Sequence, residues 1–310
     1  MNRDLKKKCR FCGRKQNAIC KNECYTNSKV KFFYSKLSTF LRDVLISFLN
    51  KKGFHVTHVS WVEDLTPQSD LQNLISRLKP VSIMEPLIRI GSGEDGGYLI
   101  PDIFRDVKIP LCFSPGVGAY SDFEIDLFKK FKIPSRLADN SIDSLPNPKE
   151  FLFFTKKHLG VVNNDNYMTL NYWVKSVASE TNIENSILQM DIDYSEYEVI
   201  LDTQIETFEK FSIMLIEFHR LHDLFLKKSF KFYKPAFEKL LLTHKVIHIH
   251  PNNNRDVKRV GEISIVDTME FTFIRQDLIN KSESKLNFPH KLDLPNNSKK
   301  KEVILPKSWY

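Results

Sequence analysis

Two hydrophobic periods follow one another along the chain, and the change between them falls near residue 87. Residues 37–49 place apolar side chains at helical spacing, and Gly53 ends this pattern. We expect the helix to pack on the main domain; the alternative is a basic amphipathic helix on a membrane surface. From residue 87, LIRI and YLIPD predict two short strands joined by a glycine-rich turn.

Seven short apolar runs follow this hairpin, and helical or polar stretches separate most of them. Strands that alternate with helices are typical of an α/β fold with a buried, largely parallel sheet. No obvious helix separates the last two runs, so we expect the final strand to be antiparallel. The predicted strands are LCFSPG (111–116), SRLADN (135–140), FLFFTKKHLG (151–160), SILQMDID (186–193), SIMLIEFH (212–219), KVIHIHPN (245–252) and EFTFIRQD (270–277).

The same pattern divides the chain into four segments. Residues 1–53 form a basic, cysteine-rich arm with the amphipathic helix, and residues 54–86 form a helical connector. Residues 87–280 form the main domain. Residues 281–310 are rich in proline and polar residues, and we expect an extended tail over the domain, near the ligand mouth.

The net charge of +8 is unevenly distributed. Residues 1–53 hold 14 Lys+Arg against 3 Asp+Glu, so the rest of the chain is slightly acidic. A nucleic-acid-binding domain carries its basic excess on the folded face, so we predict no nucleic acid for the main domain and assign any anionic or peripheral membrane contact to residues 1–53. No segment is long and apolar enough to span a membrane, and no secretory signal is visible; we expect a cytoplasmic protein.

Four of the five cysteines, Cys9, Cys12, Cys20 and Cys24, lie within sixteen residues. Two short pairs separated by a seven-residue loop could surround one tetrahedral Zn²⁺, although the spacing is not a familiar zinc-finger signature. The alternatives are reduced thiols on a flexible arm or adventitious disulfides. Cys112 is interpreted as a small apolar strand residue.

Polar residues end the first two strands of the predicted sheet. Ligands of an open α/β sheet bind at the carboxyl ends of its strands, where glycines admit a ligand and an acid can accept bonds from ribose hydroxyls. The third glycine of a dinucleotide site and a P-loop lysine are absent, which favours an adenosyl ligand without phosphates. An ordinary tight turn, or an Asx turn at residues 139–141, is the alternative. The candidate cofactor residues are Ser114, Gly116, Gly118, Asp139 and Asn140.

Ionisable residues end the fourth, fifth and sixth strands. Buried carboxylates at strand ends are costly unless they meet solvent or a ligand, so these residues predict an acceptor site. Glu124 and Glu196 are instead expected to stabilise the first turns of helices. The candidate catalytic residues are His219, Asp191 and Glu217, and the candidate substrate-binding residues are Asp193, Tyr194, His248, His250 and Asn252.

The order of these motifs resembles the FkbM-like family of class I S-adenosylmethionine-dependent methyltransferases. The motifs are DIDYSE (191–196), IEFH (216–219), HIHPNNN (248–254) and MEFTFIR (269–275), and the resemblance covers residues 87–278. It implies a Rossmann-like sheet with helices on both faces, S-adenosyl-L-methionine as cofactor, and O-methylation of a sugar hydroxyl in a glycan or glycosylated small molecule. Asp193 replaces the usual glutamate and Tyr194 the usual glycine, and a tyrosine there could wall or stack on the acceptor.

Methyl transfer to a hydroxyl requires alignment of the acceptor and removal of its proton. We predict His219 as the base, with Asp191 or Glu217 orienting the imidazole or holding the substrate hydroxyl; Asp191 as the direct base is the alternative. The same Asp, Glu and His side chains could instead hold a divalent cation that polarises a diol. A nucleotide-binding oxidoreductase and a non-catalytic binding module with a basic anchoring arm are the competing functions. The sequence leaves the ring position of the acceptor and the oligomeric state open.

Overall fold

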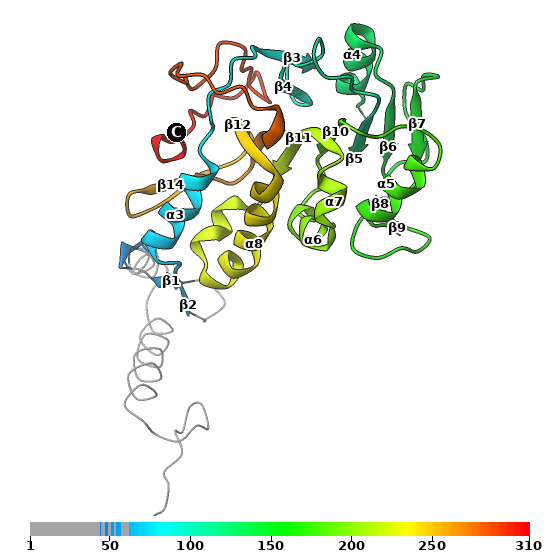
Figure 1. Ribbon diagram of the computed structural model, residues 1–310. Coiled ribbons are helices and arrows are strands. Elements are labelled where there is room, and N and C mark those ends of the chain that lie inside the picture. The colour runs from blue at the N-terminus through cyan, green and yellow to red at the C-terminus, as the bar shows by residue number, and fades with distance from the viewer. Residues whose placement is uncertain (1–43, 45–46, 49–50, 53, 57–61, 119) are drawn as a thin grey trace, which may run out of the picture. The chain divides into compact units, whose positions relative to one another are not determined.

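The computed structural model describes residues 44, 47–48, 51–52, 54–56, 62–118 and 120–310 (Figure 1). The chain divides into a smaller unit, Met1–Pro67 with Phe225–Lys227, and a larger unit, Gln68–Leu224 with Lys228–Tyr310. In the smaller unit, β1 (Phe54–Val56) pairs antiparallel with β2 (Val62–Asp64). The three described residues of the predicted helix, Val44, Ser47 and Phe48, are helical. The four cysteines proposed to bind zinc lie outside the described residues.

The larger unit contains a seven-stranded sheet whose strands coincide with the seven predicted runs. The strand order is β12-β15-β11-β10-β5-β6-β7. Both pairings of β15 are antiparallel and the others are parallel, which confirms a mostly parallel α/β sheet with an antiparallel last strand. The strands are β5 (Cys112–Pro115), β6 (Ser135–Ala138), β7 (Leu152–Thr155), β10 (Ser186–Met190), β11 (Phe211–Phe218), β12 (His244–Pro251) and β15 (Met269–Arg275).

The strand order reverses between β5 and β10. From β5 the chain proceeds outward through β6 and β7, and it then returns to the other side of β5 to form β10 and β11. Such a switch separates the loops that follow the two central strands and leaves a crevice at their carboxyl ends. The fold therefore predicts a ligand site beyond Pro115 and Met190.

Alternate residues of each strand pack on opposite faces of the sheet. On one face, Cys112, Ile187 and Ile213 join a core with the hairpin of β3 (Leu87–Gly91) and β4 (Gly97–Pro101) and with helix α4 (Asp122–Phe131). On the other face, Phe113 makes an edge contact with Trp173 of α5, and Phe218 packs on Phe237 of α8. The helices of that face are α5 (Leu170–Ala178), α6 (Glu196–Asp202) and α8 (Lys227–Thr243).

The remaining elements are short. Helix α3 (Gln68–Leu78) provides the helical part of residues 54–86, which also contain β1 and β2. Helix α7 (Ile205–Phe208) precedes β11, β8 (His158–Leu159) pairs with β9 (Tyr167–Met168), and β13 (Val257–Val260) pairs with β14 (Ile263–Val266). The 3-10 helices are η1 (Leu221–Phe225), η2 (Gln276–Leu278) and η3 (Lys307–Trp309).

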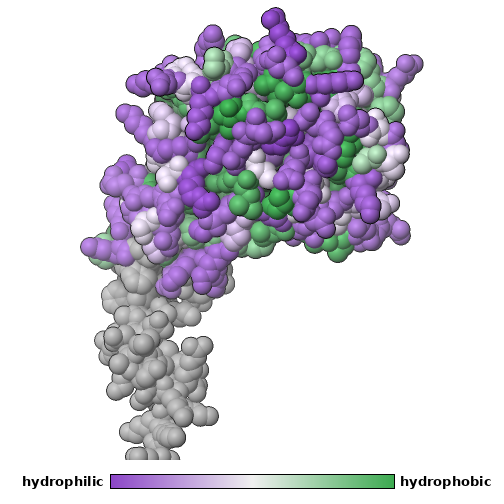
Figure 2. Space-filling view, viewed as in Figure 1, coloured by the Kyte–Doolittle hydropathy of each residue, from purple (hydrophilic) through white to green (hydrophobic). Residues whose placement is uncertain are grey.

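The C-terminal segment after residue 280 lacks α-helix and ends in η3. Trp309 is wholly buried and donates a hydrogen bond to the Ser264 carbonyl at 3.0 Å. On the face shown in Figure 2, apolar side chains form separate areas between polar ones. None of the helices in the described part of the chain is long and apolar enough to cross a membrane.

Candidate active site at the switch in strand order

The turn after β5 brings two strand ends into close contact. Gly116 has φ +85°, and a Cβ atom there would lie 1.5 Å from the backbone oxygen of Asp191. Its amide donates to the Ala138 carbonyl at 2.9 Å. Gly118 also has positive φ, and its amide donates to Oδ2 of Asp139 at 2.9 Å. Packing against Asp191 therefore requires glycine at position 116. This steric requirement holds whether or not a ligand binds there.

Asp139 forms the Asx turn that was the alternative to ribose binding, and its carboxylate also contacts the turn after β5. Its Oδ1 accepts a 2.7 Å hydrogen bond from the Ser141 amide, which is an Asx turn. Burial alone would raise the pKa of Asp139, but the hydrogen bonds from Ser141 and Gly118 hold it below its ordinary value. Each carboxylate oxygen keeps a second lone pair, so the ionised side chain can still accept bonds from a ligand.

A cavity of about 300 Å³ opens beside Asp139. Gly116, Gly118 and Asp139 line it together, so the structure brings together three of the five predicted cofactor residues. Ser114 and Asn140 do not line it; Ser114 is fully buried, and the Asn140 amide lies 3.4 Å from Nδ1 of His158. The other lining residues are Ala138, Ser141, His158, Leu159, Tyr167, Asp191, Ile192, Asp193 and Ser195.

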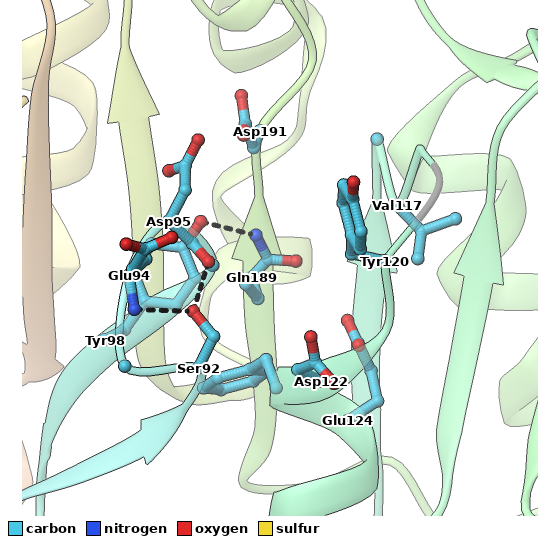
Figure 3. A pocket seen from close by; sticks show the side chains of 14 residues that line it. Ser92, Glu94, Asp95, Tyr98, Val117, Tyr120, Asp122, Glu124, Gln189 and Asp191 are labelled. Carbon is cyan, nitrogen blue, oxygen red and sulfur yellow. Dashed lines mark hydrogen bonds between the residues drawn. The ribbon is translucent and has the colours of Figure 1, made fainter. Parts of the chain in front are cut away.

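A larger cavity of about 560 Å³ lies on the other side of Gly116 and Asp191, between the β3–β4 hairpin and the loop before α4 (Figure 3). Arg89 shapes the tip of the hairpin by donating to the carbonyls of Ser92 and Glu94, each at 3.1 Å. The residues that line this cavity are Ser92, Gly93, Glu94, Asp95, Gly96, Tyr98, Gly116, Val117, Tyr120, Asp122, Phe123, Glu124, Gln189 and Asp191.

Both cavities are acidic. Among the described residues that line them, seven are Asp or Glu and none is Lys or Arg. The first turn of α4, whose amides could otherwise bind a phosphate, carries Asp122 and Glu124. A ligand of this site is therefore expected to be neutral or positively charged, because an anion would meet carboxylates without a compensating cation.

A buried hydrogen-bond chain lies beneath the larger cavity. Ser114 contacts Oε1 of Glu124 and donates to Oε1 of Gln189 at 2.6 Å, and Nε2 of Gln189 donates to the Tyr98 hydroxyl at 3.2 Å. Burial raises the pKa of Glu124 to about 7, against the hydrogen bond with Ser114. Protonated Glu124 can donate to Ser114, which leaves the single hydroxyl proton of Ser114 for Gln189. Glu124 thus belongs to the floor of the site and does not act only on the helix dipole.

His219 lies at the end of β11 with its ring almost fully buried. Nδ1 is 2.8 Å from Oε1 of Glu196, whereas Asp191 and Glu217 approach Nε2 only to 3.9 Å. Glu196 also accepts a bond from the Tyr194 amide at 3.1 Å. The expectation that Asp191 or Glu217 orients the imidazole is therefore corrected: Glu196 does so, and it is not confined to its own helix terminus.

Asp191 lines both the smaller and the larger cavity. It is therefore the catalytic candidate that lies between His219 and the open space of the site. Burial raises the pKa of Asp191 to about 7, although His219 opposes the shift. Burial would lower the pKa of His219, but the hydrogen bond to Glu196 and the nearby carboxylates raise it above its ordinary value. Neither His219 nor Glu217 is among the lining residues, so Asp191 is the catalytic candidate that faces open space.

The backbone around His219 is strained. Asp193 (φ +43°), Tyr194 (φ +80°) and Arg220 (φ +55°) all adopt the left-handed region, which disfavours side chains other than glycine. The ring of Tyr194 is half exposed and lies 5.1 Å from the His219 ring, and the Arg220 guanidinium lies 5.5 Å from the Tyr194 ring. Tyr194 thus forms an exposed wall beside His219.

The remaining candidates are His248 and His250 of β12 and Asn252, which follows this strand. Nε2 of His248 bonds Asp293 of the C-terminal segment at 2.8 Å, and Nδ1 of His250 lies 3.3 Å from Glu270. Asn252 donates to Oε1 of Glu217 at 3.0 Å. None of these three residues lines either cavity. His248 and His250 instead contact Asp293 and Glu302 of the C-terminal segment.

Two groups of side chains in the described part of the chain have ligand atoms close enough to share a metal ion. One is Asp191, Glu196 and His219, and the other is Asp95, Glu217 and Glu270; within each group the atoms lie within 4.8 Å of one another. In the first group, Glu196 and His219 already hydrogen-bond each other. The second group involves a hairpin residue, Asp95, that the sequence analysis did not select.

Comparison with known proteins adds no family assignment. No family model matches the chain, and no curated protein matches it at a significant level. Function is therefore inferred from the motifs and from the geometry of the site. The lining residues that the sequence analysis missed include Glu94, Asp95, Tyr120, His158 and Gln189. The available signals were the acids in the glycine-rich hairpin turn and a histidine near the end of the predicted strand 151–160.

Proposed function

We propose that the larger unit is an S-adenosyl-L-methionine-dependent O-methyltransferase of the FkbM-like, Rossmann-like class, and that its acceptor is a sugar hydroxyl of a glycan or glycosylated small molecule. One observation carries the proposal: Gly116, Gly118 and Asp139 share a cavity at the switch in strand order, and its lining lacks Lys and Arg among the described residues. The antiparallel last strand agrees with the resemblance.

The charge of the site favours this cofactor over a dinucleotide. A sulfonium and an α-ammonium group are positively charged and complement carboxylates, whereas a pyrophosphate would be repelled. Asp139 would accept the ribose hydroxyls, and Leu159 and Tyr167 would flank the adenine in the smaller cavity. The methionine end would extend past Gly116 towards the larger cavity, where Asp191 lies at the boundary.

In the proposed reaction, the cofactor supplies the methyl group, whose carbon exchanges its bond to sulfur for a bond to the acceptor oxygen. Asp191 accepts the hydroxyl proton on its carboxylate, because it faces both cavities and its pKa of about 7 suits a base at neutral pH. His219, held by Glu196, stabilises the charged carboxylate as a positioning residue. The acidic larger cavity suits a neutral polyol, whose hydroxyls donate to Glu94, Asp95 and Asp122.

Cofactor binding is tested with S-adenosylhomocysteine, followed by melting temperature and calorimetry. Stabilisation is expected with this ligand and not with NAD⁺. Asp139→Ala should weaken binding by one to two orders of magnitude, about 1.5 to 3 kcal/mol, because ribose hydrogen bonds are lost. The matched control is Asp143→Ala, which removes an exposed acid four residues away. Stabilisation by NAD⁺ alone would favour the oxidoreductase, and indifference to both ligands would favour a binding module.

The base is tested by Asp191→Asn together with a pH profile. Methyl incorporation from tritiated cofactor into a panel of glycans, lipids and small sugars first identifies an acceptor. Turnover should then rise about tenfold per pH unit below pH 7 and level off above it, since only ionised Asp191 accepts a proton. Asp191→Asn should lower turnover by at least about 100-fold with S-adenosylhomocysteine affinity nearly intact. A variant that keeps turnover and the wild-type profile would remove Asp191 from this role.

A further inference from the structure

Three carboxylates meet where β11, β15 and the tip of the β3–β4 hairpin come together. They belong to Asp95, Glu217 and Glu270, and one oxygen of each lies within 4.8 Å of the others. Glu217 and Glu270 are direct partners in the antiparallel register of β11 and β15, and both are more than nine-tenths buried. Like charges at such positions repel each other, so the arrangement needs a compensating group.

The surrounding hydrogen bonds compensate these charges only in part. Asn252 donates to Oε1 of Glu217 at 3.0 Å, and Nδ1 of His250 lies 3.3 Å from Oε2 of Glu270. Besides His250, the imidazole of His219 could carry a positive charge, but its Nε2 lies 3.9 Å from Oε1 of Glu217 and is shared with Asp191 and Asp193. A divalent cation would balance the remaining charge.

Asn296 of the C-terminal segment provides a second, independent observation. Its side chain points into the cluster, where Nδ2 donates to Oδ1 of Asp95 at 3.0 Å and to Oε1 of Glu270 at 2.6 Å. The residue is 6% exposed, and its Oδ1 is buried without a hydrogen-bond partner. Rotation of the amide by half a turn would bring Oδ1 to the position of Nδ2, between the two carboxylates, which is favourable only if a cation lies there.

We propose that Asp95, Glu217, Glu270 and the amide oxygen of Asn296 form a binding site for a divalent cation, with Mg²⁺, Mn²⁺ or Ca²⁺ as the fitting ions. All four donors are oxygens, the ligands that these hard cations prefer. Glu217 and Glu270 are fixed by adjacent strands, and Asp95 and Asn296 connect the hairpin and the C-terminal segment to them. The ion would therefore join three parts of the chain.

The position of the cluster suggests what the cation does. Asp95 also lines the larger cavity, and Glu217 lies 3.9 Å from Nε2 of His219. A cation at Asp95 could bind two neighbouring hydroxyls of a polyol and orient one of them towards Asp191. This role rests on the proposed methyltransferase function, whereas the cation site itself does not.

Calorimetric titration of the full chain with Mn²⁺, Mg²⁺ and Ca²⁺ separately, after treatment with EDTA, tests the site without cofactor or acceptor. One saturable ion per chain is expected, with a rise in melting temperature. Glu270→Gln should weaken the affinity by roughly 100-fold, because one carboxylate ligand becomes an amide. Asp143→Asn, a change of an exposed acid, should leave the affinity unchanged.

Asn296→Asp separates a ligand from a simple hydrogen-bond donor. A fourth carboxylate should lower the melting temperature in EDTA and tighten cation binding, so that the ion restores more stability than in the wild type. Absence of saturable binding in both wild type and Asn296→Asp, or equal affinity in wild type and Glu270→Gln, would overturn the proposal. Because S-adenosylhomocysteine binding is measured in EDTA, loss of the cation site and failure of the methyltransferase proposal give different results.

Discussion

Tyr194 is a residue held in an unfavourable backbone conformation beside His219. It adopts φ +80°, which costs a residue with a side chain on the order of 1 kcal/mol or more, and its ring is half exposed beside His219. The sequence resemblance expects glycine at this position, and the backbone observed there is one that glycine adopts easily. The tyrosine therefore costs local stability at this position, and in the proposed methyltransferase its exposed ring would form a wall for the acceptor.

Tyr194→Gly should consequently leave stability unchanged or raise it by up to about 1 kcal/mol, because relief of backbone strain offsets the loss of a half-exposed ring. Tyr172→Gly is the matched control: Tyr172 is similarly exposed but lies within helix α5, where glycine costs about 1 kcal/mol. Chemical denaturation of both variants measures the difference. Equal destabilisation of the two would show that strain at Tyr194 does not outweigh its contacts.

At the scale of elements, the turn after β5 controls the geometry of both cavities. Gly116→Ala would place a methyl group 1.5 Å from the Asp191 carbonyl, a backbone atom that cannot move without displacing the end of β10. Gly118 also has positive φ, but a methyl group there would meet no atom within 4 Å. Substitution of Gly116 would therefore cause a steric clash as well as backbone strain, whereas substitution of Gly118 would cause backbone strain alone.

We expect Gly116→Ala to destabilise the protein by at least about 3 kcal/mol and to abolish S-adenosylhomocysteine binding. Gly118→Ala should cost only about 1 kcal/mol, the strain of a left-handed alanine, and should retain measurable binding. Melting temperature and calorimetry on both variants provide the comparison. If both variants behaved alike, the close approach of β5 and β10 would not govern the site.

The strands were predictable because most of the apolar runs are buried within the sheet and end in polar residues at its carboxyl edge; only the edge strand β7 is largely outside the core. That rule located Gly116, Gly118, Asp139 and Asp191 at the cavities. Glu196 was missed because its approach to His219 depends on positive φ angles in the preceding loop, which hydrophobic periodicity does not encode. The hairpin acids were missed for a related reason: their place at the site depends on long-range packing of β3 and β4 on the sheet.

The same limit applies to β12. His248 and His250 were expected to bind the acceptor, but each has a partner from the segment after residue 280. Asp293 binds His248, and Glu302 lies 3.5 Å from Nε2 of His250. A sequence of polar and proline residues predicts an extended segment without specifying its contacts. These contacts bury His248 and His250, so that both side chains have partners within the protein.

At the scale of the larger unit, the C-terminal segment connects the edge of the sheet to the β3–β4 hairpin, which lines the larger cavity. Asn296 bonds Asp95, and Asn253 of the loop after β12 donates to the Asn297 carbonyl at 2.9 Å. Trp309 anchors the end of the segment: its ring lies 6.0 Å from Phe271 of β15. The hairpin wall of the larger cavity is thus supported by residues about 200 positions later in the chain.

Trp309→Ala should therefore destabilise the protein by about 3 to 5 kcal/mol, since it removes a fully buried aromatic side chain and leaves the Ser264 carbonyl without its donor. Ile304→Ala, which truncates an exposed side chain five residues earlier, should change stability by less than about 0.5 kcal/mol. Urea denaturation measures both. If the segment supports the hairpin, the hydrogen-exchange protection of residues 92–98 should also fall in Trp309→Ala and not in Ile304→Ala; retained protection would mean that β3 and β4 hold the cavity wall without the C-terminal anchor.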